Sequence, residues 1–475
     1  MSDALHYISA TEALEKFRSR ELSPVDLMRA VIDQAEVWEP QINAFSHRFF
    51  EQALHEAKAS EARYAKGEPV GVLDGLPVGI KDEVEVKGQP VTEGSLLYKD
   101  RMGEEDAVLV SRLRAAGAIF HARTTCPEFC TLFNTQTRLF GVTRNPYNLD
   151  ITPGGSSGGS GAALAAGTAT LATGSDIGGS IRFPASQCGL VGFKPPFGRV
   201  PENIEPFNLE VYCANGPMAR TVADTALMQN VMSGSHPEDA ASTLPKVDIP
   251  LDFEGDLTGT RIAYTMNFDY LEIQDDIVRN TNDAIDRLRS LGAEVVEVNL
   301  NFPDNIEEAY NAHMDPFFCA MIAEKLELYG ADMCDYNVKL INDAMERLED
   351  RGAFFRGAVV ESQMYAKFGR LMTEFDVLVC PTVMSNTLTA GFNSAVEDYV
   401  INGKVLDYDL QFSTCHIFNM MGRCPAISVP SGIGDNGVPT GLHIISKAYD
   451  DIAVFRVASA FEKTWDKPFL PAPPA

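Results

Sequence analysis

Two clusters of glycine and serine, separated by a run of small apolar residues, constrain the fold more than any other feature of this sequence. The first cluster, residues 152–161, reads TPGGSSGGSG and leads directly into the alanine-rich run 162–172. The second, residues 178–180, follows the segment LATGSD. A flexible linker would lack these apolar flanks. The pattern instead predicts a glycine loop, a buried helix, a strand and a second glycine turn.

The rest of the chain alternates between helix-like and strand-like patterns. Residues 8–65 predict helices, and residues 76–82 predict a buried strand that ends on a charge. A strand, a helix and a strand follow residue 260, and two short buried strands closed by proline end at Pro381 and Pro430. Repeated alternation of this kind is typical of the α/β class, and no internal repeat or long linker divides the chain.

The net charge excludes some classes of partner. The chain carries 66 acidic and 39 basic residues, a formal net charge of -27. A surface this acidic repels phosphate backbones and anionic lipids, so we expect neither nucleic-acid nor membrane binding. The N-terminal segment has no signal-peptide pattern, and the nine cysteines include no C-x-x-C pair or zinc-finger spacing. We therefore expect a cytoplasmic protein with reduced thiols and no bound metal.

The first glycine cluster also contains a candidate for serine chemistry. Residues 154–158 match G-x-S-x-G, which is the pattern of a nucleophilic serine on a sharp turn. No lysine follows the glycines as a phosphate-binding loop requires. An α/β-hydrolase interpretation would make Ser156 the nucleophile and would need a later histidine as its base. The histidines that follow Ser156 in the sequence lie in contexts that favour structural roles: His236, His313, His416 and His443.

Several long segments resemble the amidase signature family. They are residues 75–82, 140–148, 152–167, 174–200, 216–224 and 424–432. The resemblance covers about residues 5–470 and weakens between 235 and 375. It implies an amidase-signature α/β fold, with a large mixed, mostly parallel twisted sheet covered by helices on both faces. It also implies one domain over residues 1–475, whose parts are N-terminal helices (1–65), a catalytic core (66–235 and 375–475) and a variable, largely helical segment that shapes the substrate site (236–374).

The resemblance implies a Ser–cis-Ser–Lys triad. Ser180 matches the nucleophile, Ser156 the proton relay and Lys81 the base. A lysine can act as a base only when its amine is neutral, and we expect burial at the end of the apolar strand to lower the pKa of Lys81. The family's relay serine follows a cis peptide bond, so we expect Gly155–Ser156 to be cis, with Ser157 as a supporting hydrogen-bonding residue.

The second glycine turn matches the family's oxyanion hole. The resemblance assigns the hole to the backbone N–H groups of Ile177, Gly178, Gly179 and Ser180. The family commonly has threonine where Ile177 stands, but only the backbone is used there. Asp176 and Arg182 flank the turn, and we expect them to form a structural ion pair that holds it.

The substrate pocket is less constrained by pattern. In the family the segment around residues 128–134 lines the acyl pocket, so Cys130, Thr131 and Phe133 are candidates, with ordinary core packing as the open alternative. A branch of the family that acts on aminoacyl-tRNA binds an ammonium group with an aspartate ten residues before the glycine that matches Gly422. Here that position is Phe412, which favours a hydrophobic substrate.

Three functional hypotheses follow. The first is hydrolysis of a non-peptide C–N bond in a small-molecule aryl amide, alkyl amide or carbamate (urethane), through an acyl-enzyme intermediate and without a cofactor. The second is a glutamine-hydrolysing amidotransferase subunit that acts on aminoacyl-tRNA within a complex. The third is an esterase that uses Ser156 and a histidine. A homodimer is expected by family analogy alone.

Overall fold

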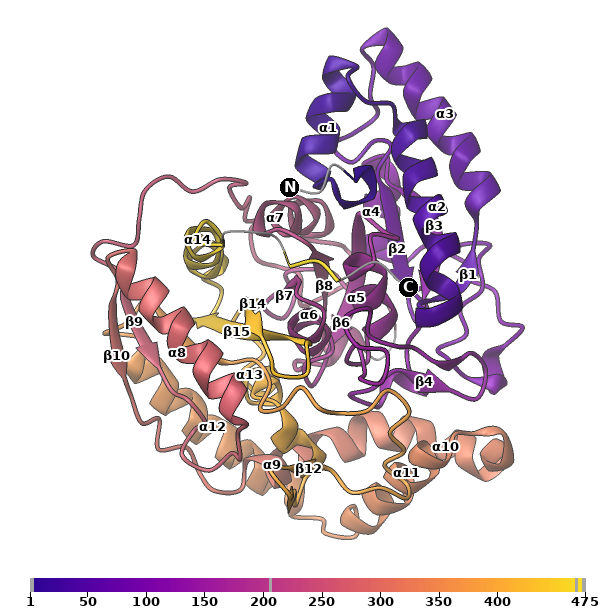
Figure 1. The fold of residues 1–475 in the computed structure, drawn as a ribbon. Coiled ribbons are helices and arrows are strands. Elements are labelled where there is room, and N and C mark those ends of the chain that lie inside the picture. The colour runs from indigo at the N-terminus through magenta and orange to yellow at the C-terminus, as the bar shows by residue number, and fades with distance from the viewer. Residues whose placement is uncertain (1–3, 205–206, 466–468, 472–475) are drawn as a thin grey trace.

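A single large mixed sheet forms the centre of the molecule in the computed structural model, which describes residues 4–204, 207–465 and 469–471 (Figure 1). The strand order is β1-β3-β2-β6-β8-β7-β14-β15-β11-β9-β10. These strands are β1 (Phe45–Arg48), β2 (Pro77–Lys81), β3 (Ile119–Thr124), β6 (Leu171–Asp176), β7 (Val191–Lys194), β8 (Ala214–Ala219), β9 (Arg261–Tyr264), β10 (Glu294–Glu297), β11 (Val377–Pro381), β14 (Ala426–Ile433) and β15 (Pro439–Ser446).

The sheet is mixed, as expected, but the expectation that it is mostly parallel is wrong. Strands β3, β2 and β6 run parallel near one edge, and β11, β9 and β10 run parallel at the other. The strands between these two groups, and β1 at its edge, pair antiparallel. Antiparallel neighbours need only a short connection, as between β14 and β15, whereas parallel neighbours need a crossover of a dozen residues or more.

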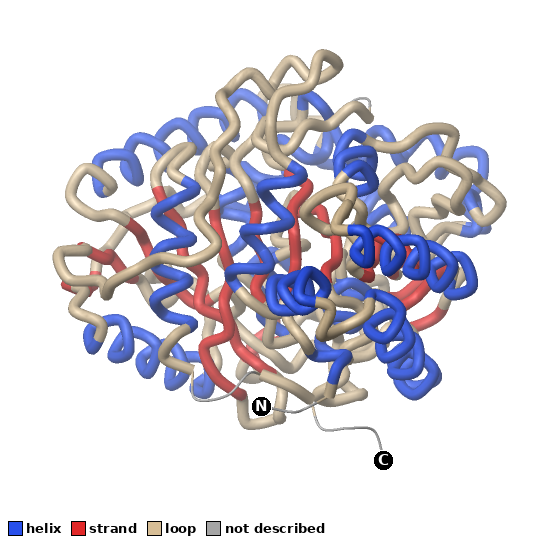
Figure 2. The backbone as a smooth tube through the Cα atoms, turned by 90° about the horizontal axis from the view of Figure 1, so that it is seen from above, coloured by secondary structure: helices blue, strands red, loops and turns tan. Residues whose placement is uncertain are grey.

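Helices cover both faces of the sheet (Figure 2). Along β14, Ile427 and Val429 pack in the core cluster that contains α14, whereas Ala426 belongs to the cluster around α12 and α13. This alternation is the mark of a strand buried on both sides. The helices are α1 (Ala10–Ser19), α2 (Pro24–Ile42), α3 (Phe50–Lys66), α4 (Val108–Ala115), α5 (Gly158–Ala165), α6 (Arg182–Gln187), α7 (Val222–Met232), α8 (Asp275–Ser290), α9 (Ile306–Met314), α10 (Ala320–Tyr329), α11 (Asp335–Arg347), α12 (Ala353–Leu371), α13 (Cys415–Met420) and α14 (Asp451–Glu462).

The N-terminal region contains the expected helices and one unexpected strand. Ser9 and Ser23 cap α1 and α2 by accepting hydrogen bonds from backbone N–H groups, and Pro24 occupies the first helical position of α2. Residues 45–48, however, form β1, which pairs antiparallel with β3. A strand of four residues carries too short an alternation to be separated from its helical neighbours by pattern.

The helix behind the glycine loop begins earlier than the alanine-rich run predicts. It starts at Gly158 and ends at Ala165, so the glycines form its first turn. Gly159 permits close packing there, since a Cβ atom would lie 2.3 Å from the backbone nitrogen of Thr125. The small residues thus bring the loop that carries Ser156 directly against β3.

The segment 236–374 contributes both helices and sheet. It contains α8 to α12, and its strands β9 and β10 extend the central sheet beyond β11. Figure 1 shows α9, α10 and α11 together on one side of the molecule, in the orange part of the chain. Within the described residues, no helix combines the length and apolarity needed to cross a membrane.

Candidate active site

The three triad candidates meet where β2 and β6 end. Lys81 is the last residue of β2, and Ser180 lies in the turn between β6 and α6. The two strands are parallel neighbours, so their carboxyl ends lie at the same edge of the sheet. Ser156 reaches this edge from the loop before α5, and the Gly155–Ser156 peptide bond is cis.

A hydrogen bond joins two of these side chains directly. The Lys81 ammonium Nζ donates to Ser156 Oγ at 2.8 Å and to Ser175 Oγ at 2.8 Å. Lys81 is fully buried, and Ser156 and Ser180 are nearly so. No hydrogen bond links the Ser156 and Ser180 side chains in the described part of the chain. The neighbouring residue Ser157 contacts the nucleophile turn instead, since its backbone N–H donates to the Ser180 carbonyl at 3.2 Å. The Ser157 hydroxyl donates to the Ser175 carbonyl at 3.4 Å.

Asp176 organises the glycine turn before Ser180. Its carboxylate accepts hydrogen bonds from the backbone N–H groups of Gly179 at 2.9 Å and Ile181 at 3.1 Å. The Gly179 N–H therefore already has an acceptor in this structure, and its place in the oxyanion hole stays a prediction. The N–H groups of Ile177, Gly178 and Ser180 have no acceptor among the described residues. Gly179 has φ of 130°, and a Cβ atom there would lie 2.6 Å from Cys415 Cβ, so only glycine fits.

A buried ion pair fixes this turn to the sheet. Arg182 Nη2 lies 2.7 Å from Asp176 Oδ1, and neither side chain is exposed. Asn419 donates to the same carboxylate oxygen at 2.9 Å. Burial alone would raise the pKa of Asp176, but the charge of Arg182 and the hydrogen bonds from Arg182 and Asn419 outweigh it and hold the pKa well below its usual range. The carboxylate therefore remains ionised.

Lys81 is not the neutral amine that its burial suggested. Glu83 Oε1 lies 3.1 Å from Lys81 Nζ, and the Cys130 thiol donates to Glu83 Oε2 at 2.7 Å. Burial lowers the pKa of Lys81, but the Glu83 carboxylate beside the amine favours the charged form, and the pKa lies above its ordinary value. In return, the lysine charge overcomes the effect of burial on Glu83 and lowers the pKa of that carboxyl. The pair is therefore ionic in the free enzyme.

Glu83 was not among the expected site residues, although it stands only two residues after Lys81. It lies in the turn after β2, from which its carboxylate reaches the amine of Lys81. A charged residue beside a candidate catalytic lysine changes the expected protonation state of that lysine.

Two cavities border the two serines of the triad. The nucleophile cavity is about 650 Å³, part of it open to solvent, and contains Ser180, Ile177 and Gly178 in its lining. The relay cavity is about 860 Å³, also partly open, and contains Ser156, Ser175 and Glu83. Cys130, Ile177 and Phe318 line both cavities.

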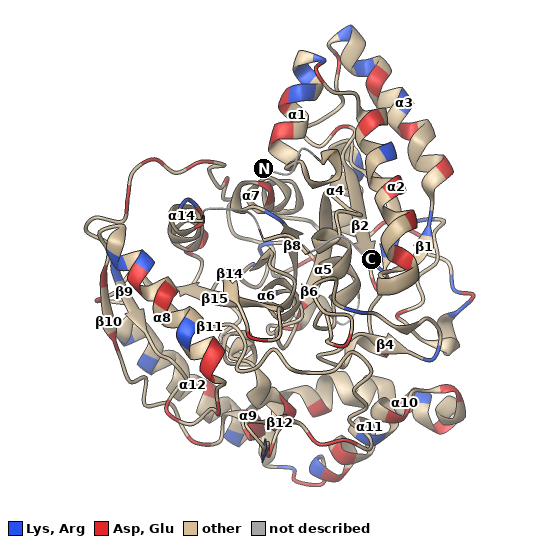
Figure 3. Cartoon of the chain, in the orientation of Figure 1, with Lys and Arg blue, Asp and Glu red and all other residues tan. Residues whose placement is uncertain are grey.

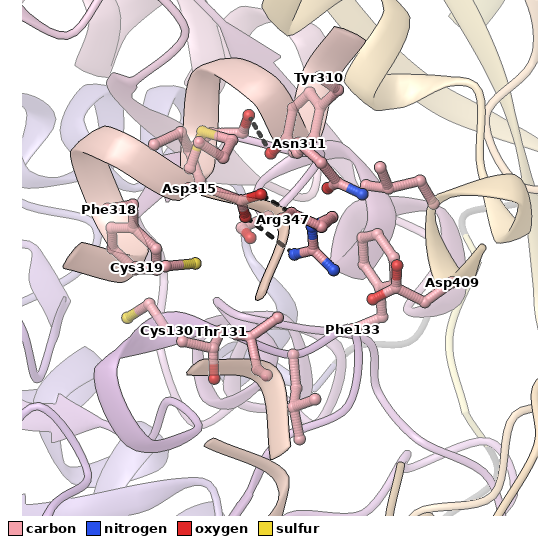
Figure 4. Close-up of a pocket in the computed structure, with 17 residues that line it drawn as sticks. Cys130, Thr131, Phe133, Tyr310, Asn311, Asp315, Phe318, Cys319, Arg347 and Asp409 are labelled. Carbon is pink, nitrogen blue, oxygen red and sulfur yellow. Dashed lines mark hydrogen bonds and ion pairs between the residues drawn. The ribbon is translucent and has the colours of Figure 1, made fainter. Parts of the chain in front are cut away.

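The nucleophile cavity has an apolar body and a charged end (Figure 4). Cys130, Thr131 and Phe133 line it, together with residues of α9 and α11. At the charged end, Arg347 Nε donates to Asp315 at 2.7 Å, and the Asp409 carboxylate also faces the cavity.

Phe412 is absent from the lining of both cavities in the described part of the chain, and its contact with a substrate stays a prediction. Its ring lies 6.3 Å from that of Phe183 and is 1% exposed, and Phe183 in turn stacks on Phe133. The short 3-10 helix Asp409–Phe412 presents its first two residues to the nucleophile cavity and turns Phe412 into the core. Phe412 therefore supports the cavity wall from behind.

The histidines have structural environments. His443 is fully buried and lies 3.0 Å from Arg182 Nη1, and burial together with the Arg182 charge holds its pKa well below the ordinary value. His313 hydrogen bonds to Glu210 at 2.9 Å. Across the described ranges, neither Ser156 nor Ser180 has a histidine as a hydrogen-bond partner. This arrangement does not support the histidine-dependent esterase.

Comparisons with known proteins agree on one family. The sequence matches the family described as Amidase over residues 26–455. An acylamidase from Rhodococcus erythropolis is 33% identical over 466 residues, which cover 96% of this chain and 95% of that protein. A glutamyl-tRNA(Gln) amidotransferase subunit from Chloroflexus aggregans is 32% identical over 494 residues, covering 97% of each. The solved structure of a bacterial aryl acylamidase superposes with a TM-score of 0.87 at 29% identity, covering 97% of this chain and 96% of that one.

Proposed function

The chain belongs to the amidase family, and we propose that it hydrolyses the C–N bond of a small, non-peptide amide through an acyl-enzyme on Ser180. The observation that carries the proposal is the 2.8 Å hydrogen bond between Lys81 and Ser156, beside a glycine turn that exposes Ser180 to a largely apolar cavity. A serine hydroxyl is a weak nucleophile and needs such a neighbouring base.

In the proposed reaction, Lys81 first loses its extra proton to solvent. The neutral amine then takes the proton of Ser156, and Ser156 takes that of Ser180 as the Ser180 oxygen bonds to the carbonyl carbon. The N–H groups of Ile177, Gly178 and Ser180 stabilise the resulting oxyanion. Ser156 protonates the leaving amine as the C–N bond breaks, which leaves the acyl group bound to Ser180 as an ester. Water then attacks this ester by the same proton relay, and its hydrolysis restores Ser180.

The walls of the nucleophile cavity support an aryl or alkyl acyl group. Phe133, Met314 and Phe318 offer apolar contact beside Ser180. The similarity to an acylamidase and to an aryl acylamidase points in the same direction. A carbamate requires the same attack on its carbonyl carbon, so carbamates belong to the proposed substrate range.

A glutamine-hydrolysing amidotransferase subunit is the second candidate. Asp409 favours it, because its carboxylate lines the nucleophile cavity and could bind an ammonium group. The charge distribution opposes a tRNA partner, since Figure 3 shows Lys and Arg scattered among Asp and Glu over the helices and the net charge is -27. We therefore rank it below the amide hydrolase.

A substrate panel tests the proposal. We expect turnover of 4-nitroacetanilide or of an aryl carbamate, and no release of ammonia from glutamine. Ser180→Ala should abolish the acyl-enzyme detected by mass spectrometry while the circular dichroism spectrum is unchanged. Glutaminase activity in place of anilide hydrolysis would favour the second candidate, and full anilide hydrolysis by Ser180→Ala would exclude this serine as the nucleophile.

A further inference from the structure

Glu83 is a partly buried carboxylate next to the triad that the proposed reaction does not use. It lies in the turn after β2, two residues beyond Lys81. One carboxylate oxygen lies 3.1 Å from Lys81 Nζ, and the other accepts the thiol hydrogen of Cys130. The side chain is 22% exposed and lines the relay cavity beside Ser156. Glu83 thus contacts the base of the triad and faces the space that a substrate can enter.

The other groups around the Lys81 amine differ from Glu83 in charge. Ser156 and Ser175 offer neutral hydroxyl oxygens at 2.8 Å. The buried thiol of Cys126 and the partly buried thiol of Cys130 lie nearby. The hydrogen bond with Cys130, together with burial, raises the pKa of Cys126 well above the usual value, so this thiol is protonated.

The charged side chains of Arg123 and Asp82 have partners other than the Lys81 amine. The Arg123 guanidinium on β3 donates to the backbone carbonyls of Lys81 at 3.0 Å and of Val84. The carboxylate of Asp82 accepts from Thr92. Among the described residues, Glu83 is the acidic side chain that forms an ion pair with Lys81.

We propose that Glu83 is a positioning residue that holds Lys81 as an ammonium in the free enzyme and thereby sets the pH at which this lysine becomes a base. The inference rests on the proposed function, because it assigns Glu83 a role in the same Ser180–Ser156–Lys81 relay. A carboxylate 3.1 Å from an ammonium stabilises the charged lysine. The hydroxyls of Ser156 and Ser175 hold the amine in place when the Glu83 charge is removed. An experiment can therefore separate the effect of the Glu83 charge from the effect of the position of the amine.

The test is Glu83→Gln, which keeps the size and hydrogen-bonding ability of the side chain and removes its charge. In the wild type, kcat/KM for 4-nitroacetanilide should rise by about tenfold per pH unit through the neutral and alkaline range, because only the neutral lysine reacts. In the variant the profile should move to lower pH by at least about one unit, so that activity at pH 7 rises by about tenfold.

A second readout does not depend on amide turnover. The rate at which phenylmethanesulfonyl fluoride labels Ser180, measured against pH, should show the same displacement in Glu83→Gln. If the wild type hydrolyses no compound of the panel, the proposed function fails, yet the labelling profiles still report whether Glu83 controls Lys81.

Glu85→Gln is the matched control. Glu85 lies two residues further along the chain and pairs with Arg101, and it does not line either cavity in the described part of the structure. Its profile should coincide with that of the wild type. The inference would be overturned if the pH profile of Glu83→Gln coincided with that of the wild type. Loss of labelling at every pH in a folded variant would also overturn it, because Glu83 would then be needed for more than its charge.

Discussion

Asp176→Asn tests whether the buried ion pair holds the glycine turn of the active site. The carboxylate of Asp176 accepts two hydrogen bonds from the Arg182 guanidinium, at 2.7 and 2.9 Å, and one from Asn419. It also accepts from the backbone of Gly179 and Ile181. The substitution removes the charge and leaves a fully buried guanidinium whose remaining partners are the neutral groups Asn419 Oδ1 and His443 Nε2.

The expected loss is large because a buried charge left without its partner cannot be solvated. Breaking such a pair costs about 3–5 kcal/mol of the free energy of unfolding. Urea denaturation followed by circular dichroism measures this difference. The turn should also loosen, so that kcat on 4-nitroacetanilide falls by at least about tenfold, since removal of well-placed oxyanion contacts costs this much or more.

Asp286→Asn provides the control, because Asp286 pairs with Arg289 on the surface of α8 with 74% of its side chain exposed. Surface pairs of this kind contribute little, and its unfolding curve should match the wild type. If Asp176→Asn were no more destabilised than this control, the argument that the ion pair organises the turn would be refuted.

The pH dependence of stability follows from the same pair. The pKa of Asp176 is depressed in the folded state, so the stabilisation is complete above the ordinary aspartate pKa and is lost as the pH falls toward the folded value. The wild type should therefore lose more stability than Asp176→Asn when the pH is lowered from 6 to 3, as measured by urea denaturation. Equal losses in the two proteins would contradict the ionic state of the pair.

Two further predictions concern the triad and the cavity wall. Lys81→Met should lower kcat by at least about 10²-fold at every pH, because Lys81 is the base that contacts Ser156 among the described residues. A pH profile of kcat that still rose with pH would show that another group activates the serine. Phe412→Ala should destabilise the protein by about 3–5 kcal/mol with little change in KM, whereas Phe133→Ala should raise KM for an anilide. Denaturation curves and steady-state kinetics distinguish the two, and a large KM effect at Phe412 would place it in contact with substrate after all.

Local pattern predicted the features that depend on neighbours in sequence. Proline and serine marked the start of α2, and glycine clusters marked the loop before α5 and the turn before Ser180. Strand alternation was strong enough to show the α/β class but too short to reveal β1. The identity of the triad candidates came from the resemblance of whole segments, and the structure places Lys81 and Ser156 within hydrogen-bonding distance.

The α/β class and the turns that carry the serines follow from local sequence, because they depend on the conformational freedom of glycine and on hydrophobic periodicity within short segments. The tertiary structure was needed for the directions of the central strands, the engagement of the Gly179 N–H by Asp176, and the place of Phe412 behind the cavity wall. It also decided the charge of Lys81. Burial alone would neutralise this lysine, but the Glu83 carboxylate 3.1 Å away favours its charged form, and that distance is set by the fold.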